Sequence, residues 1–294
     1  MTEITSQQSA SWRDYYEMCK PRVVMLMILT SVVGMLLAVP GMVPLDVLIL
    51  GNLGIALVAG SGAAVNHLID RKVDSLMKRT HNRPLPQGRV EPLHAILFAT
   101  LIGVIGMAIL LFWVNPLCAW LTLASFVGYA FIYTGYLKRA TPQNIVIGGL
   151  SGAMPPLLGW AAVTGTIDPG ALILVLIIFA WTPPHFWALA IHRKDEYAKT
   201  GIPMLPVTHG EFVTKVHIII YTVILVLVST FPYLSGMSGM LYLLAALALG
   251  AIFMAWSLAL MFRPTPRTAM ETFKYSIVYL AVLFVALLTD HYLF

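Results

Sequence analysis

The chain has 294 residues, of which 59% are hydrophobic and only 11% charged, and its formal net charge is +5. Its mean hydropathy is +0.84. Because no ordinary globular core buries that much apolar surface, the composition excludes a soluble domain and indicates an integral membrane protein.

The first 20 residues form a polar segment that includes Glu3, Asp14 and Glu17. This segment lacks the apolar core of a signal peptide and the Arg-rich, acid-poor character of a transit peptide. The simplest location that it predicts is a prokaryotic plasma (inner) membrane, which the chain would cross several times.

Nine apolar runs of about 20 residues follow, each long enough to span a bilayer as a helix. In chain order they are Val23–Val39, Val47–His67, Leu93–Val114, Leu117–Leu137, Asn144–Val163, Ala171–Ile191, Val213–Pro232, Met240–Phe262 and Thr272–Thr289. No linker rich in Ser, Gly or charge divides them. We therefore expect residues 1–294 to form a single domain, an all-α bundle of nine transmembrane helices.

Charge is distributed asymmetrically around these spans. Every lysine and arginine falls on one side of the membrane, and the other side carries only Asp46, Asp168 and Asp290 as formal charges. The positive-inside rule therefore predicts a cytoplasmic N-terminus and a C-terminus outside. Anionic lipid headgroups explain the net positive charge, so it is no argument for nucleic-acid binding. Cys19 and Cys118 fall at opposite faces and cannot pair.

A polar triplet ends the second span. Asn66, Asp70 and Asp74 follow one another at four-residue spacing, so on a helix they share one face. Two carboxylates and an amide oxygen suit Mg²⁺, which proteins usually hold with one or two carboxylates and the phosphates of a substrate. Solvated helix ends give a similar pattern, but ionisable groups at membrane depth are usually functional.

Basic residues surround this triplet, as a site for metal and phosphate requires. They are Arg71, Lys72, Lys78, Arg79, Arg83 and Arg89. Farther on, Lys138 and Arg139 precede a helix restart whose free N–H groups could add to an anion site. Topological anchoring explains these two cations nearly as well.

A second polar group follows the sixth span. His185 and His192 are seven residues apart, and Asp195 and Glu196 continue the same helical face. This pattern indicates a polar face at the cytoplasmic membrane boundary. For His185 the alternative is strong, because a lone intramembrane histidine often hydrogen-bonds a neighbouring helix.

The segment from Asn66 to Asp74 resembles the first aspartate-rich motif of the UbiA-type intramembrane prenyltransferases. That family has nine transmembrane helices and transfers prenyl groups from diphosphates. Further segments resemble its haem-prenylating branch, namely 20–22, 78–86, 144–149, 181–187 and 201–206. One departure is that Ile191 stands four residues before Asp195, where many members of the family have a second aspartate pair.

The resemblance implies that farnesyl diphosphate and haem B react at the cytoplasmic face to give haem O and diphosphate. It implies catalytic roles for Asn66, Asp70, Asp74, His192, Asp195 and Glu196, of which the first three would bind Mg²⁺ as cofactor. Substrate-binding roles are implied for Lys20, Arg22, Lys78, Arg79, Arg83, Lys138, Arg139, His185, Trp187 and Arg193. Haem B would be a substrate and no cofactor. Membrane lipid surrounds the chain, and a haem A synthase or terminal oxidase assembly is a candidate partner.

Two other functions fit part of the pattern. A sibling enzyme that prenylates an aromatic acid or a quinone precursor would use the same first motif. A secondary transporter would also combine broken helices with intramembrane charges, but its charges are expected near the bilayer midplane. Here they cluster at one membrane face, which favours the enzyme.

Overall fold

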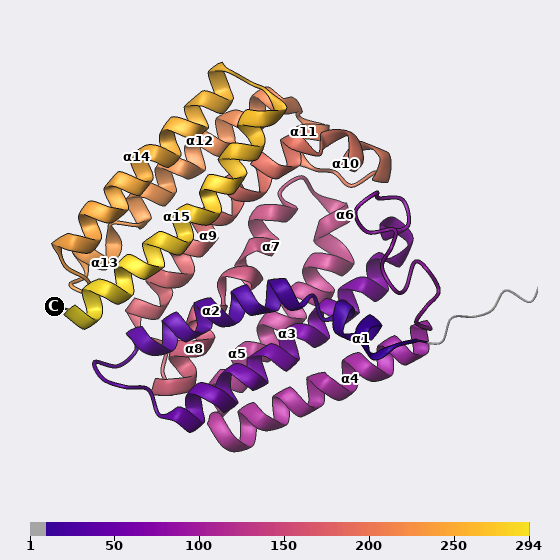
Figure 1. The fold of residues 1–294 in the computed structure, drawn as a ribbon, viewed down its shortest axis with the longest axis horizontal. Helices are drawn as coiled ribbons and strands as arrows, with labels where there is room; N and C mark the ends of the chain where they lie inside the picture. The colour runs from indigo at the N-terminus through magenta and orange to yellow at the C-terminus, as the bar shows by residue number, and fades with distance from the viewer. Residues whose placement is uncertain (1–9, 294) are drawn as a thin grey trace, which may run out of the picture.

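The computed structural model describes residues 10–293, which form helices and no strand (Figure 1). The α-helices are α1 Trp12–Met18, α2 Pro21–Leu37, α3 Leu45–Asp74, α4 Pro92–Ile109, α5 Pro116–Val127, α6 Lys138–Ala140, α7 Asn144–Ala153, α8 Pro155–Thr164, α9 Pro169–His192, α10 Lys194–Thr200, α11 Leu205–Thr208, α12 Gly210–Val228, α13 Phe231–Leu234, α14 Met240–Phe262 and α15 Pro266–Leu293. Two π-helical segments, η1 Leu110–Val114 and η2 Gly128–Leu137, continue α4 and α5.

Eight helical runs in residues 10–293 are long and apolar enough to cross a membrane, and α1 with α2 makes a ninth if this pair, bent by 51°, counts as one span. Proline sets several boundaries: Pro21, Pro92, Pro116 and Pro169 each open a helix, where their missing N–H costs no hydrogen bond. The fifth predicted span is broken into α7 and α8 at Pro155. The prediction of an all-helical membrane bundle is confirmed.

The long connections 75–91 and 193–209 lie at one end of the bundle together with α6, and we call this end the loop end (Figure 1). Met77 of the first connection packs with Tyr197, Met204 and Leu205 of the second in one buried cluster. The C-terminal end of α15 lies at the opposite end (Figure 1). The cytoplasmic assignment of the loop end and the single-domain organisation remain predictions.

The polar N-terminal segment contains a short helix that the sequence did not indicate. Residues 1–9 of that segment lie outside the described residues. Ser11 caps α1, since its Oγ accepts from the backbone N–H of Arg13 and its own N–H donates to Asp14. Arg89 Nη1 lies 2.9 Å from Asp14 Oδ1 and thereby ties α1 to the first connection.

The contact between α2 and α8 depends on two glycines. A methyl group on Gly34 would overlap the backbone carbonyl of Pro156, and one on Gly159 would overlap that of Ser31. Small residues let membrane helices approach this closely. The C-terminal half of α2 is therefore fixed to α8, and its N-terminal half forms a wall of the cavity described below.

Candidate functional site

The polar triplet of α3 is buried in the structure. Asn66, Asp70 and Asp74 are 4%, 1% and 4% exposed, and helix α3 continues through Asp74, so the three side chains share one face as their spacing predicts. Asn66 Nδ2 donates to Asp70 Oδ2 at 2.9 Å. Buried carboxylates require partners, and the surrounding cations supply them.

Four cations converge on the triplet. Lys138 Nζ lies 2.5 Å from Asp70 Oδ2, Arg139 Nη2 lies 3.5 Å from Asp70 Oδ1, and Arg83 Nη1 lies 2.7 Å from Asp74 Oδ2. The Lys20 ammonium donates to Asn66 Oδ1 and, at 3.3 Å, to the Tyr129 hydroxyl. Lys20, Arg83, Lys138 and Arg139 thus outnumber the carboxylates of Asp70 and Asp74. This excess of positive charge suits a multiply charged anion.

Thr134 belongs to this site although sequence reasoning did not single it out. Its Oγ1 accepts from Asn66 Nδ2 at 3.1 Å and donates to the Tyr129 carbonyl at 2.9 Å. Thr134 and Tyr129 lie in η2, and π-helical segments often occur at functional sites. The only sequence signal was a threonine inside an aromatic run.

The triplet offers a metal an incomplete set of ligands. Asp70 Oδ1 is buried and accepts no hydrogen bond, and its ion-pair partner, Arg139 Nη2, stands 3.5 Å away. Within residues 10–293 no group of three or more His, Cys, Asp or Glu side chains is placed to hold a metal ion. The residues therefore fit Mg²⁺ that completes its shell with phosphate and water.

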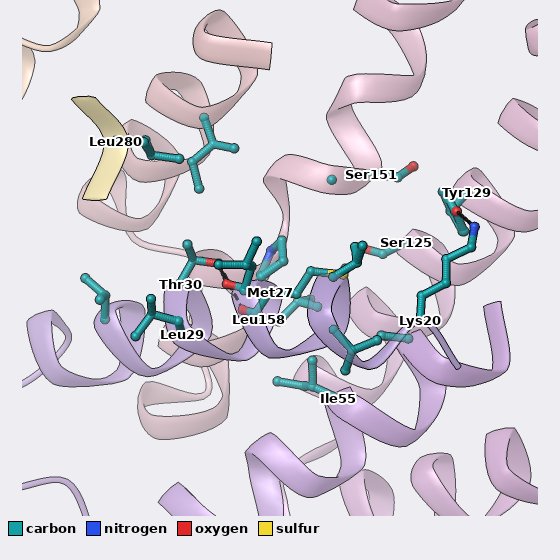
Figure 2. Close-up of a pocket in the computed structure, with 18 of the residues that line it drawn as sticks. Lys20, Met27, Leu29, Thr30, Ile55, Ser125, Tyr129, Ser151, Leu158 and Leu280 are labelled. Atoms are coloured by element: carbon teal, nitrogen blue, oxygen red, sulfur yellow. Dashed lines mark hydrogen bonds between the residues drawn. The ribbon is translucent and has the colours of Figure 1, made fainter. Parts of the chain in front are cut away.

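An apolar cavity of about 620 Å³ extends along α2. It reaches the triplet through Lys20, which lines the cavity and donates to Asn66. Lys20 and Tyr129 lie at one end of it, and Leu29 and Leu280 lie toward the other (Figure 2). Most of its walls come from α2, α3, α5, α8, α9 and α15. This arrangement can hold a molecule with a charged head and a long apolar tail.

His185 and Trp187, two residues of α9 expected to bind substrate, lie in different surroundings. His185 lines the cavity. Trp187 is fully buried, and its ring packs edge-on against His217 and Tyr221, away from the cavity. The structure therefore does not bring Trp187 to the position expected of a substrate-binding residue.

The expected continuous polar face from His185 to Glu196 does not form. The chain leaves helical geometry at Arg193, with φ −110° and ψ 23°, so α9 and α10 are separate helices. His192 is exposed and its Nδ1 lies 3.1 Å from the Pro266 carbonyl, and Asp195 is also exposed. Glu196 Oε2 lies 3.9 Å from Arg193 Nη1.

The remaining predicted cations are distributed around the loop end. Arg79 of the first connection is exposed. Arg22 and Lys78 are exposed. None of these three cations forms an ion pair with the triplet. Cys19 and Cys118 are both free, as expected.

The chain is similar to known proteins in sequence and in fold. The chain is 65% identical to a protoheme IX farnesyltransferase of Saccharophagus degradans over 100% of the chain and 98% of that protein. It is 64% identical to a protoheme IX farnesyltransferase of Hahella chejuensis over 97% and 95% of the two chains.

In fold, the chain is similar to a digeranylgeranylglyceryl phosphate synthase, with a TM-score of 0.81, 19% identity and coverage of 95% and 98%. It is also similar to a UbiA homologue from Archaeoglobus fulgidus bound to GPP and Mg²⁺, with a TM-score of 0.65, 17% identity and coverage of 93% and 99%. The family description "UbiA prenyltransferase family" matches residues 27–288, nearly the whole membrane bundle. The chain belongs to the UbiA prenyltransferase family.

Proposed function

We propose that this chain is a Mg²⁺-dependent farnesyltransferase that joins the farnesyl group of farnesyl diphosphate to a vinyl group of haem B, with addition of water, to give haem O and diphosphate. One observation carries the proposal: a buried Asn-Asp-Asp triplet, surrounded by more cations than carboxylates, lies next to an apolar cavity of about 620 Å³. Relatives that are 62–65% identical and are called protoheme IX farnesyltransferases support this choice of substrates.

The diphosphate would bind where the cations now pair with carboxylates. Arg83 and Lys138 can turn from Asp74 and Asp70 to phosphate oxygens, because a phosphate offers them equally strong charge-assisted hydrogen bonds. Lys20 can do the same from Asn66. The freed oxygens of Asn66, Asp70 and Asp74 would hold Mg²⁺, which supplies Lewis-acid stabilisation of the charge on the leaving diphosphate.

The farnesyl chain would lie in the cavity along α2. Apolar walls exclude water, which protects an allylic cation from hydrolysis. Phe126, Tyr129 and Trp181 line this cavity and can stabilise the cation through their ring faces. The chain's cationic head group site and its apolar cavity thus match the two parts of a prenyl diphosphate.

The proposed transfer joins the farnesyl group, the haem vinyl group and water, and it releases diphosphate and one proton. The C1–O bond of farnesyl diphosphate breaks and its electron pair leaves with diphosphate. The terminal carbon of the haem vinyl group bonds to C1, which leaves a cation on the vinyl carbon next to the porphyrin. Water adds to that carbon and releases one proton. His192, Asp195 and Glu196 at the loop end are proposed to position haem or direct this water, and Arg22, Lys78, Arg79, Arg139 and Arg193 are candidate partners for the haem propionates.

We further propose that the loop end faces the cytoplasm of a bacterial plasma membrane. A haem A synthase or terminal oxidase assembly is the proposed partner, because haem O must be passed on from within the bilayer. The transporter alternative is disfavoured, since the ionisable triplet lies near the loop end of α3 rather than halfway along it. Prenylation of an aromatic acid or quinone precursor remains the alternative that the test below addresses.

The test uses the purified full chain in lipid nanodiscs with farnesyl diphosphate, Mg²⁺ and either haem B or 4-hydroxybenzoate. We expect haem B to gain the mass of a farnesyl group plus a hydroxyl group, and EDTA to abolish this product. 4-Hydroxybenzoate should remain unchanged. Prenylation of 4-hydroxybenzoate without conversion of haem would replace this function by the aromatic alternative.

A further inference from the structure

His185 is held rigidly in the cavity wall. Its imidazole ring stacks on Trp181 at 4.1 Å between ring centres and on Phe273 at 4.6 Å. The Trp181 indole is itself fixed, since its Nε1 donates to the Ser276 carbonyl at 2.7 Å. Two aromatic neighbours and one hydrogen bond thus define the ring position, and only its edge is available to a ligand.

The hydrogen bonds around Ser276 determine which imidazole nitrogen carries the proton. Ser276 Oγ lies 2.6 Å from the Phe273 carbonyl oxygen, and two oxygens at that distance need a proton between them. Only the serine hydroxyl can supply it. Ser276 Oγ therefore accepts from His185 Nδ1, which is also 2.6 Å away, so Nδ1 carries the proton. The lone pair of the neutral imidazole is on Nε2, which has no hydrogen-bond partner among residues 10–293.

His185 and the triplet lie at a similar depth in the bundle. His185 is seven residues before the loop end of α9, and Asn66 is eight residues before the loop end of α3. At 1.5 Å per residue, both lie roughly 10–12 Å inside. Lys20, which contacts Asn66, lines the same cavity as His185. A flat molecule seated at His185 could therefore present one edge toward the diphosphate end of the cavity.

We propose that His185 Nε2 is the axial ligand of the haem iron while haem B is bound as substrate. This inference rests on the proposed function. A metal-ligating histidine typically donates its other ring N–H to a fixed acceptor, and Ser276 is such an acceptor. Coordination would fix the distance of the porphyrin edge from the diphosphate site and so select which vinyl group meets C1. His185 is thus a positioning residue for the acceptor, and Ser276 sets its tautomer.

Iron spectroscopy tests this proposal without relying on turnover. Ferric haem B is titrated into the full chain in nanodiscs, and absorption and electron paramagnetic resonance spectra are recorded. Wild type should show a histidine-ligated haem, and His185→Ala should lose this signature and bind haem about 10–100-fold more weakly. Added imidazole should restore the spectrum. His217→Gln is the matched control, because His217 packs on Trp187 and lies outside the cavity lining.

Two further measurements separate ligation from packing. Metal-free protoporphyrin IX, followed by fluorescence, should bind wild type and His185→Ala with similar affinity, since it has no iron to coordinate. Ser276→Ala should weaken haem binding with protoporphyrin binding unchanged. If the alanine variant fails to fold, His185→Met replaces it in the test. This variant keeps an apolar ligand of similar reach and should produce a methionine-type haem spectrum.

The result that overturns the proposal is an unchanged haem spectrum in both His185→Ala and His185→Met. Equal weakening of haem and protoporphyrin binding would also overturn it, because His185 would then act by shape alone. Failure of the proposed function is a different result: wild type would form no farnesylated haem from haem B, whatever its spectrum.

Discussion

The two polar groups at the loop end differ in how the chain holds them. The triplet on α3 is buried, and its carboxylates are paired with Lys138, Arg139 and Arg83, which come from other parts of the chain. His192 and Asp195 are exposed, and helix α9 ends at His192, before it could align Asp195 with His185. One group is prearranged by several helices, whereas the other lies where α9 passes into the second connection.

This difference indicates a division of labour. Prearranged charges stabilise a developing charge without reorganisation, which is what cleavage of a diphosphate ester needs. Residues on a connection can move with a substrate, as is common for groups that admit or position it. We therefore expect the triplet to control ionisation of the diphosphate, and the second connection to control the entry of haem or water.

Membrane orientation is the most direct way to break this comparison, because both groups must face the same compartment. A reporter active only in the cytoplasm should give signal when fused after Arg89, Arg139 or Lys199. It should be silent after Asp46, Asp168 or Phe294. Signal from the C-terminal fusion would contradict the nine-span arrangement.

Loss of a carboxylate from the triplet should produce the largest change in activity. Asp70→Asn and Asp74→Asn remove ligands proposed for Mg²⁺, so turnover should fall by at least about 100-fold. Product is measured by mass, and thermal unfolding is recorded to show that the bundle is intact. Asp46→Asn, at the opposite end of α3, is the matched control and should keep wild-type turnover. Normal turnover in either triplet variant would remove that residue from the site.

Loss of one cation should weaken diphosphate binding less severely. Arg83→Gln removes one charge-assisted hydrogen bond, which corresponds to about 10–100-fold in affinity for a non-hydrolysable farnesyl diphosphate analogue. Calorimetry in the presence of Mg²⁺ measures this affinity. Arg267→Gln changes an exposed arginine in the first turn of α15 and should have no effect. Equal affinities of the two variants would show that Arg83 serves only to pair with Asp74.

The smallest effect on analogue binding is expected at His192, the last residue of α9 before the second connection. His192→Ala should change analogue affinity by less than about threefold, because His192 lies outside the triplet and contacts Pro266. Haem conversion should fall by more than that. If His192→Ala and Asp70→Asn lowered analogue binding equally, both connections would form one diphosphate site and the division of labour would be wrong.

Much of the fold could be predicted from the sequence because lipid imposes length and apolarity on every spanning helix. The predicted span Met240–Phe262 has the same bounds as α14. The short helix α1 was missed, since it has only seven residues and its cap depends on two local hydrogen bonds. The π-helical geometry of η2 also leaves no clear period in the sequence.

The candidate site was predictable where one helix sets the geometry and not where several helices meet. Four-residue spacing was enough to place Asn66, Asp70 and Asp74 on one face. The contact of Thr134 with Asn66 spans 68 residues and depends on tertiary packing. Trp187 was wrongly expected to bind substrate, because its motif does not reveal that its ring packs against His217 of another helix.

The glycine contact between α2 and α8 has a consequence for how such enzymes diverge. The C-terminal half of α2 tolerates no added atom at Gly34, so it should change only together with Pro156 and its neighbours. The N-terminal half, which includes Val24, Met27 and Thr30, lines the cavity and has no such constraint. Relatives that accept longer or shorter prenyl chains should therefore differ in the first half of this helix and keep the second half. Sequence variation in this one helix would then separate into two parts: a constant half that preserves the packing of the bundle and a variable half that follows the length of the substrate.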